Sequence, residues 1–278
     1  KHEVSIIDNF HTGKIENLSE FKNKVKIHEI DIRDKSHVRD IIKNSDGVFH
    51  QAALANVYES FSKEEEYYDV NVNGTENVFD ASLEFRKKIV FASSSSVYGE
   101  VDKIPIKEDF PKNPIHPYGK TKLETEVLAK KFSERGLKVI GLRYFNVFGK
   151  GQNEAYAGVI TKFLSRINQK HPPIIYGDGS QTRDFVFVRD VAKANLDAMN
   201  SNIDFGFYNI GSGKATSILE LAEIMLNLSG LKMQLIFESP LQGDAMKSLA
   251  DISLTKKELG WKPSYNLESW FKEEVFIN

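Results

Sequence analysis

The regular alternation of short apolar runs with amphipathic stretches, in the first half of the chain, constrains the fold most strongly. The runs expected to form buried strands are residues 4–8, 25–31, 47–50, 89–92 and 137–144. The expected helices are residues 67–85 and 118–135, and a shorter one that Ser36 caps, with Val38, Ile41 and Ile42 on one face. Such alternation predicts βαβ units, right-handed crossovers and a parallel sheet covered on both faces.

From about residue 149 the segments become shorter and are interrupted by Pro172-Pro173 and by glycines. Residues 185–188 predict another buried strand, and residues 190–199 a helix. Ser217 and Glu220 form a capping box before a helix whose apolar stripe is Ile218, Leu221, Ala222 and Met225. We therefore predict an α/β protein, with a Rossmann-type doubly wound parallel sheet and a smaller mixed α/β domain against its carboxyl edge.

Composition excludes several classes of function. The net charge is −2 and no block of Lys or Arg is present, which argues against a nucleic-acid partner. With no cysteine, disulfides, thiolate catalysis and zinc–thiolate sites are excluded, and the seven histidines are too scattered to predict a metal site. No run approaches the roughly 18 apolar residues of a membrane span, and no signal peptide is recognisable, so we expect a cytoplasmic protein without membrane association.

Tyr118 and Lys122 carry the strongest sign of chemistry. Four residues apart, they lie on one face of the expected helix, and an ammonium near a phenol favours the phenolate. This would bring the phenol, whose free pKa is about 10, toward the range of a useful general base. Ser94 ends the preceding strand and could hydrogen-bond the same substrate oxygen. The alternative is a chance pair, a half-buried tyrosine beside a solvated lysine.

Asp8 ends the first strand, where a dinucleotide-binding fold places the acid that holds the adenosine ribose. An acid there favours NAD over its 2′-phosphorylated form, although Asp8-Asn9 is equally good turn chemistry. The glycine-rich loop that should precede this strand by about twenty residues is absent. The first βα unit of the sheet is thus missing from this chain, and we expect a sequence that begins late rather than a protein that lacks the loop.

Taken together, the motifs of the chain resemble those of extended short-chain dehydrogenases/reductases, specifically the nucleotide-sugar epimerase/dehydratase family and, nearest within it, the UDP-glucose and UDP-N-acetylglucosamine 4-epimerases. The resemblance covers essentially the whole chain. Its motifs are Asp8-Asn9, Asp31-Ile32, Asn71-Val72-Asn73-Gly74-Thr75, Ser94 with Tyr98-Gly99, Tyr118 with Lys122, Arg143-Tyr144-Phe145-Asn146, Tyr176-Gly177-Asp178-Gly179, Thr182-Arg183-Asp184-Phe185, Gly243-Asp244, Ala250-Asp251 and Leu259-Gly260-Trp261.

The resemblance implies an NAD-dependent isomerase acting at carbon 4 of a UDP-hexose. Tyr118 would take the proton of the 4-hydroxyl, Lys122 would hold the nicotinamide ribose, and Ser94 would bind the reacting oxygen. It also implies an NAD-binding domain of residues 1–149 and about 183–206, and a substrate domain of about 150–182 and 207–278. A homodimer is implied by the same analogy.

Further site residues are carried over by position. The implied cofactor-binding residues, besides Tyr118 and Lys122, are Asp8, Asn9, Asp31, Ile32, Ala52, Ala53, Asn71 and Phe145. The implied substrate-binding residues are Ser94, Asn146, Tyr176, Arg183, Asp244 and Ser248. Arginine suits a diphosphate because its planar fork donates in pairs. Ser248 stands where 4-epimerases limit the size of the group on carbon 2, so we expect UDP-GlcNAc and UDP-GalNAc to be accepted as well as UDP-glucose and UDP-galactose.

Departures from the family pattern leave other activities open. Ser95 and Ser96 replace the acids of the 4,6-dehydratases and the glutamate of the decarboxylases, so these reactions are disfavoured. Leu241 stands where the family has an arginine on the substrate diphosphate, and Val70 where some epimerases have an asparagine. The alternatives are a UDP-uronate 4-epimerase, a sugar-nucleotide reductase, or a non-catalytic nucleotide-sugar binding protein, against which the retained Ser94, Tyr118 and Lys122 argue.

Overall fold

The structure, a computed structural model, describes residues 2–21, 23–152, 158–241 and 245–276. The chain forms two compact units, each assembled from separate stretches of sequence. The first unit consists of residues 1–97, 116–142 and 198–207, and the second of residues 98–115, 143–197 and 208–278. The predicted boundaries of the cofactor and substrate domains stay a prediction, because they were drawn from the roles of residues rather than from compactness.

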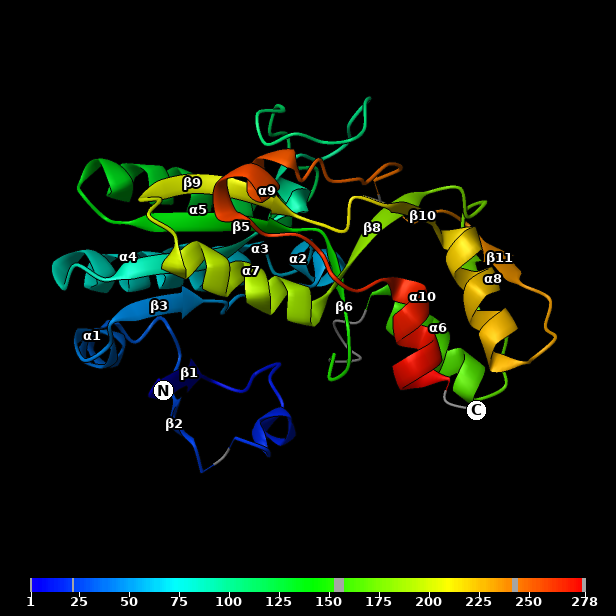
Figure 1. The fold of residues 1–278 in the computed structure, drawn as a ribbon, viewed down its shortest axis with the longest axis horizontal. Coiled ribbons are helices and arrows are strands. Elements are labelled where there is room, and N and C mark those ends of the chain that lie inside the picture. The colour runs from blue at the N-terminus through cyan, green and yellow to red at the C-terminus, as the bar shows by residue number, and fades with distance from the viewer. Residues whose placement is uncertain (1, 22, 153–157, 242–244, 277–278) are drawn as a thin grey trace. The chain divides into compact units, whose positions relative to one another are not determined.

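Two sheets run through the first unit (Figure 1). β1 (Val4–Asp8) and β2 (Val25–Glu29) pair in parallel. The second sheet has the order β3-β4-β5-β9, formed by β3 (Gly47–His50), β4 (Lys88–Ser94), β5 (Val139–Tyr144) and β9 (Phe205–Ile210). β3 and β4 are parallel, with Gly47 opposite Lys88 and His50 opposite Phe91. The carboxyl ends of β3 and β4 therefore lie together, at the edge where open α/β sheets bind ligands.

Three helices of the first unit share one apolar core with this sheet: α1 (Lys35–Lys43), α4 (Gly74–Glu84) and α5 (Pro117–Glu134). Their buried side chains include Val38, Phe79 and Phe132, and strand β4 contributes Phe91. Shorter turns, α2 (Val57–Ser60), α3 (Glu64–Tyr68) and the π-helical η2 (Asp69–Asn73), connect β3 to α4. Gly74 permits close packing there, because a Cβ would lie only 2.6 Å from Ile32 Cδ1.

Most elements expected in this unit are confirmed. The strand at residues 4–8 has the predicted bounds, and α5 ends one residue before the expected end. Ser36 as the cap of α1 is wrong: Asp34 is the N-cap, and its carboxylate accepts from His37 N at 3.2 Å, while Ser36 lies inside the first turn. The expected long helix at residues 67–85 is divided among α3, η2 and α4.

The second unit is mixed α/β. β6 (Asn146–Phe148) pairs in parallel with β8 (Thr182–Phe187), which pairs in antiparallel fashion with β10 (Ala215–Ser217). β7 (Ile174–Tyr176) and β11 (Ile236–Glu238) form a separate parallel pair. The helices are α6 (Val159–Asn168), α7 (Val188–Asn200), which continues into the first unit, α8 (Ile218–Ser229), α9 (Ser253–Leu259) and α10 (Leu267–Trp270), followed by a π-helical turn, Phe271–Val275.

The apolar stripe predicted for α8 is confirmed, since its four side chains are all buried. Ser217 caps this helix by accepting from Glu220 N at 3.0 Å. Two buried aspartates also organise the unit. Asp184 accepts four hydrogen bonds, from Ser212 N, Ser212 Oγ, Gly213 N and Ala250 N. Asp190 binds Ser264 and Tyr265 near the C-terminal end of the chain.

Candidate functional site

Tyr118 and Lys122 lie one turn apart in the first half of α5. The helix begins at Pro117, whose fixed φ and missing N–H suit the first helical position. Tyr118 is half-buried, and Lys122 is only 5% exposed. Lys122 Nζ donates to Ala92 O at 2.9 Å and lies 5.9 Å from the centre of the Tyr118 ring. The ammonium and the phenol are thus neighbours in one compact unit, as the sequence predicts.

Strand β4 ends with Ser93 and Ser94, which lie next to α5. Ser94 is buried at the end of the strand, and its hydroxyl interacts with that of Tyr118. Ser94 Oγ also accepts from Ser96 N at 3.1 Å. The adjacent Ser93 donates to the buried Glu126 of α5 at 2.6 Å. Glu126, which the sequence analysis did not single out, therefore ties the serine-bearing strand end to the helix that carries Tyr118 and Lys122.

The pKa values in this group follow from burial. Burial raises the pKa of Tyr118, and the hydrogen bond with Ser94 partly offsets that increase. The expectation that Lys122 brings the tyrosine closer to neutrality is therefore not met in this structure, because the ammonium is bonded to the Ala92 carbonyl rather than to the phenol. Burial also lowers the pKa of Lys122, from its usual 10.5 to about 8.

Lys122 therefore makes a testable contribution to the pH dependence of stability. Between pH 8 and pH 10.5 the unfolded chain holds the lysine proton more tightly than the folded chain, so the free energy of unfolding rises with pH in this window. The difference between the two pKa values corresponds to about 3 kcal/mol. Wild type should gain about this much relative to Lys122→Met between pH 7.5 and pH 10.5, measured by urea denaturation of both proteins. If the free energies of unfolding of wild type and Lys122→Met changed with pH in parallel, the prediction would be contradicted.

A second buried cluster holds the loop after β3, in which the expected cofactor residues Ala52 and Ala53 are half-buried. Asn71 Oδ1 accepts from Leu54 N at 2.8 Å, and Asn71 Nδ2 donates to Leu54 O and to Thr121 Oγ1, both at 3.0 Å. Because the amide of Asn71 is occupied by protein groups, we propose that it acts on the cofactor by shaping this loop rather than by direct contact.

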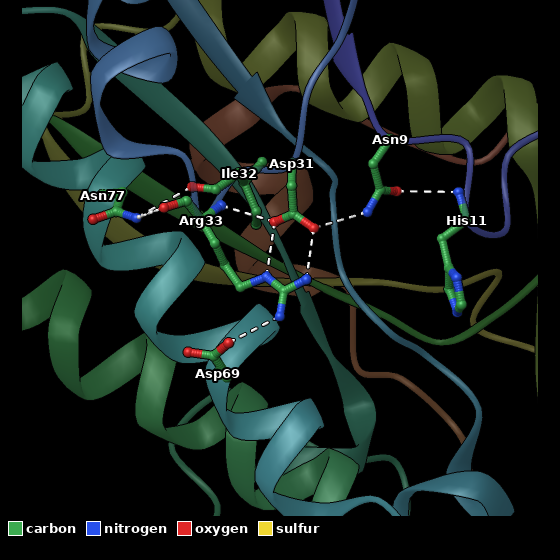
Figure 2. Close-up of polar contacts among 7 residues, drawn as sticks. All are labelled: Asn9, His11, Asp31, Ile32, Arg33, Asp69 and Asn77. Carbon is green, nitrogen blue, oxygen red and sulfur yellow. Dashed lines mark hydrogen bonds and ion pairs between the residues drawn. The ribbon is translucent and has the colours of Figure 1, made fainter.

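Figure 2 shows three residues expected to bind the cofactor, Asn9, Asp31 and Ile32, with their polar neighbours. Asp31 forms a bidentate ion pair with Arg33, with Nε to Oδ1 at 2.9 Å and Nη2 to Oδ2 at 2.8 Å. Arg33 N and Asn9 Nδ2 also donate to this carboxylate, and Arg33 Nη1 extends to Asp69. The hydrogen bonds from Arg33 lower the pKa of Asp31 to about 2. Each carboxylate oxygen of Asp31 thus accepts two hydrogen bonds from protein groups.

Arg33 was not identified from the sequence, and its partners explain why. Asp69 lies 36 positions away on η2, so only the fold brings the pair together. Asp8, by contrast, has the turn role considered for it, and its role on the adenosine ribose stays a prediction. It ends β1, and its Oδ1 accepts from Phe10 N at 2.8 Å, as a turn aspartate does. Its Oδ2 makes no hydrogen bond within the described residues, so it can still accept one from a ligand.

The residues present fit a bound dinucleotide. Lys122 Nζ is buried with three N–H bonds, and within the described chain only the one to Ala92 O has a partner. Gly13 lies against the Asp8 carboxylate, where a Cβ would come within 3.1 Å of an oxygen, so a side chain would crowd the ligand-accepting end of β1. Ile32 is buried directly after Asp31. Asp8 and Lys122 would hold hydroxyls of the two riboses of the dinucleotide, Asp8 at the adenosine and Lys122 at the nicotinamide.

Of the residues expected to bind the substrate, Ser94 lies in the first unit, and Asn146, Tyr176, Arg183 and Ser248 lie in the second. Asn146 pairs with Phe185, two positions from Arg183 on β8, so Asn146 and Arg183 lie on one face of the β6-β8-β10 sheet. Arg183 Nη1 donates to Thr182 O and Ala245 O, both at 2.7 Å. Ser248 is buried, with its backbone N 3.5 Å from Thr182 Oγ1. Asn146, Arg183 and Ser248 thus lie on or beside strand β8.

Other expected residues are placed differently. Tyr176 ends β7 and is half-buried, and its carbonyl accepts from Gln181 Nε2 at 2.7 Å. Phe145, which follows β5 and precedes β6 in the chain, is buried and falls in the second unit, and its contact with the cofactor stays a prediction. Asp244 lies outside the described residues. Within the described residues, no group of acidic or histidine side chains could hold a metal ion, and no helix is long and apolar enough to cross a membrane.

Known proteins are similar to this chain in sequence and in fold. The model of the NAD dependent epimerase/dehydratase family matches residues 1–211. A putative UDP-glucose 4-epimerase of Methanocaldococcus jannaschii is 39% identical over 279 residues, which cover 99% of this chain and 90% of that protein. The structure of a UDP-N-acetylglucosamine 4-epimerase of Methanobrevibacter ruminantium, in complex with UDP-N-acetylmuramic acid, superposes with a TM-score of 0.92 at 38% identity over 99% of this chain and 88% of the other.

A third similar protein is the UDP-glucose 4-epimerase of Thermotoga maritima, solved with UDP-glucose. It has a TM-score of 0.94 at 33% identity, over 99% of this chain and 90% of the other. These superpositions confirm the predicted fold class, a Rossmann-type α/β fold.

Proposed function

The chain belongs to the NAD dependent epimerase/dehydratase family, and we propose that within it the protein is a UDP-hexose 4-epimerase. The observation that carries the proposal is the grouping of Tyr118, Lys122 and Ser94 in the first unit, with a buried ammonium beside a phenol that hydrogen-bonds a serine. Nothing in helix packing requires this trio. The similar proteins from Methanocaldococcus and Thermotoga, both described as UDP-glucose 4-epimerases, support the choice of reaction.

The proposed reaction assigns one proton-transfer step to Tyr118. A bound NAD would supply reversible hydride transfer at carbon 4, and inversion requires that the hydride return to the opposite face of the sugar. Tyr118 Oη takes the proton of the 4-hydroxyl as a 4-keto sugar forms, and gives it back when the hydroxyl is restored. Ser94 Oγ donates to the same substrate oxygen. Lys122, buried one turn further along the helix, would hold the nicotinamide ribose through N–H bonds other than the one to Ala92 O.

We propose that the residues of β6, β8 and the following segment bind the nucleotide sugar. Arg183 would bind the diphosphate, because its guanidinium is held by two carbonyl oxygens and keeps a fixed orientation. Asn146 lies on the same sheet face and would bind the same side of the substrate. Tyr176 would lie near the uracil, and Asp244 and Ser248 near the sugar.

The position of Ser248 supports a wide sugar range. The side chain is buried and small, whereas the preceding Lys247 is exposed, which favours the serine over the lysine as the residue that faces the sugar. We propose that UDP-GlcNAc and UDP-GalNAc are interconverted as well as UDP-glucose and UDP-galactose. The similar protein from Methanobrevibacter is described as a UDP-N-acetylglucosamine 4-epimerase.

The test of the function is a product assay. Purified full-length protein is incubated separately with UDP-glucose, UDP-GlcNAc and UDP-glucuronate, and the sugar nucleotides are resolved by chromatography. We expect UDP-galactose and UDP-GalNAc to form to equilibrium without a net change in NADH absorbance, because the hydride is returned in each turnover. Conversion of UDP-glucuronate alone would assign the protein to the uronate epimerases. Binding of the sugar nucleotides without any product would indicate a non-catalytic role.

A further inference from the structure

His116 combines two contacts at the start of α5. Its Nδ1 accepts a hydrogen bond from Gly119 N at 2.9 Å, which makes it the N-cap of the helix. Its ring also stacks on that of Tyr118, with centroids 5.9 Å apart and planes 6° apart. The side chain is 6% exposed. A single residue therefore holds both the first turn of the helix and the tyrosine within it.

The first turn needs such support. Tyr118 is the second helical residue, so its backbone N–H and that of Gly119 have no partner inside the helix. Pro117 has no N–H to be satisfied, and His116 supplies the acceptor for Gly119. Without this acceptor the turn frays, and the tyrosine backbone moves with it. Lys122 lies one turn further along, where its own backbone is held inside the helix.

The chemistry of histidine fits this position in a way that the common caps do not. Asn, Asp, Ser and Thr are the preferred N-cap residues, and none of them carries a ring to place against Tyr118. Because Nδ1 accepts, the imidazole is neutral with its proton on Nε2. Burial lowers the pKa of His116, which keeps this form at neutral pH. An aspartate cap would instead bring a negative charge near a phenol that must become a phenolate.

We infer that His116 is a positioning residue for the proposed reaction: it fixes the place and tilt of the Tyr118 phenol by capping α5 and by stacking on the ring. The inference rests on the proposed function, in which the phenol exchanges a proton with the sugar. Small displacements of a reacting group are costly, since a shift of about 1 Å can lower the rate by about a hundredfold. His116 contacts the tyrosine through its ring and takes no part in the proton transfer itself.

Two substitutions separate the two contacts. His116→Asn keeps an oxygen acceptor for Gly119 N but removes the ring, and His116→Phe keeps the ring but removes the acceptor. We expect kcat to fall about tenfold to a hundredfold in His116→Phe, with KM within about twofold of wild type. In His116→Asn the restored cap should return kcat to within about fivefold of wild type. Ser217→Ala is the matched control, because it removes an equivalent N-cap bond of 3.0 Å from α8.

The control should lower the thermal midpoint as His116→Phe does and leave kcat unchanged. Hydrogen exchange at the Gly119 amide measures the capping hydrogen bond independently of enzyme activity. The exchange should be fast in His116→Phe and slow in His116→Asn. The inference is overturned if kcat of His116→Phe stays within twofold of wild type, if KM rather than kcat changes, or if Gly119 exchange is the same in all three. Wild-type protein without epimerase activity would count against the proposed function, while the exchange data still decide whether His116 fixes the turn.

Discussion

Replacing Tyr118 with phenylalanine is expected to lower kcat by at least about a hundredfold. Only the hydroxyl is removed, and the ring keeps its stacking on His116 and its place above Lys122. A positioned general acid–base group contributes about 10² to 10⁴ in rate, and Ser94 cannot replace it because a serine hydroxyl does not ionise in this pH range. KM for the UDP-sugar should stay within about threefold, since the lost group acts mainly in the transition state.

Tyr67→Phe provides the matched control for this change. Tyr67 is fully buried in the same unit, and its hydroxyl lies within hydrogen-bond distance of Asn56 O, at 2.8 Å, and of Glu59 Oε2, at 3.0 Å. Its removal costs the hydrogen bonding of this hydroxyl, about 1 to 3 kcal/mol because one partner is a carboxylate, and should leave kcat unchanged. Initial rates with UDP-glucose and with UDP-GlcNAc, measured beside thermal unfolding of each variant, check the prediction. A Tyr118→Phe enzyme with more than a tenth of the wild-type kcat would show that another group moves the proton.

The elements of the first unit could be predicted because their signals are local. β3 has the expected bounds: it starts at Gly47 and carries Val48 and Phe49 before His50. The cap of α1 was placed wrongly because Asp34 and Ser36 are both good N-caps, and sequence alone does not show which one accepts from His37. The division of the helix between α3 and α4 also lacks a local signal, because its π-helical turn forms where Asn71 packs against the loop at Leu54.

In the candidate site, local sequence predicts the reactive residues but not the distant residues that hold them. Tyr118, Lys122 and Ser94 were predicted because their spacing has chemical meaning by itself. The contacts that hold them were not predicted, because each joins residues far apart in the chain: Ser93 contacts Glu126 across 33 positions, and Asn71, named only as a cofactor residue, contacts Thr121 across 50. The one cue that was available is His116, since a polar residue directly before a proline that starts a helix is in the N-cap position.

Replacing Ser248 with tyrosine is expected to abolish activity on the N-acetylated sugars while largely preserving activity on the plain hexoses. The segment that carries Ser248 is fixed by backbone bonds on both sides: Met246 O accepts from Thr182 N at 3.0 Å, and Ala250 N donates to Asp184 at 3.0 Å. A larger side chain therefore cannot be accommodated by a shift of the chain without breaking these bonds. The phenol ring must occupy space beside the serine position, which the proposal assigns to the group on carbon 2.

Steric exclusion of this kind should exceed the 1 to 3 kcal/mol that a missing methylene costs, because overlap is penalised more than an unfilled gap. We expect kcat/KM for UDP-GlcNAc and UDP-GalNAc to fall more than about a hundredfold in Ser248→Tyr, and kcat/KM for UDP-glucose and UDP-galactose to fall less than about tenfold. Ser248→Ala, which keeps the position small, should change neither pair. Thermal unfolding of both variants shows whether the buried ring disturbs the fold. Equal losses on the two substrate pairs, or no loss on either, would mean that Ser248 does not face carbon 2 and that the sugar range is set by another residue.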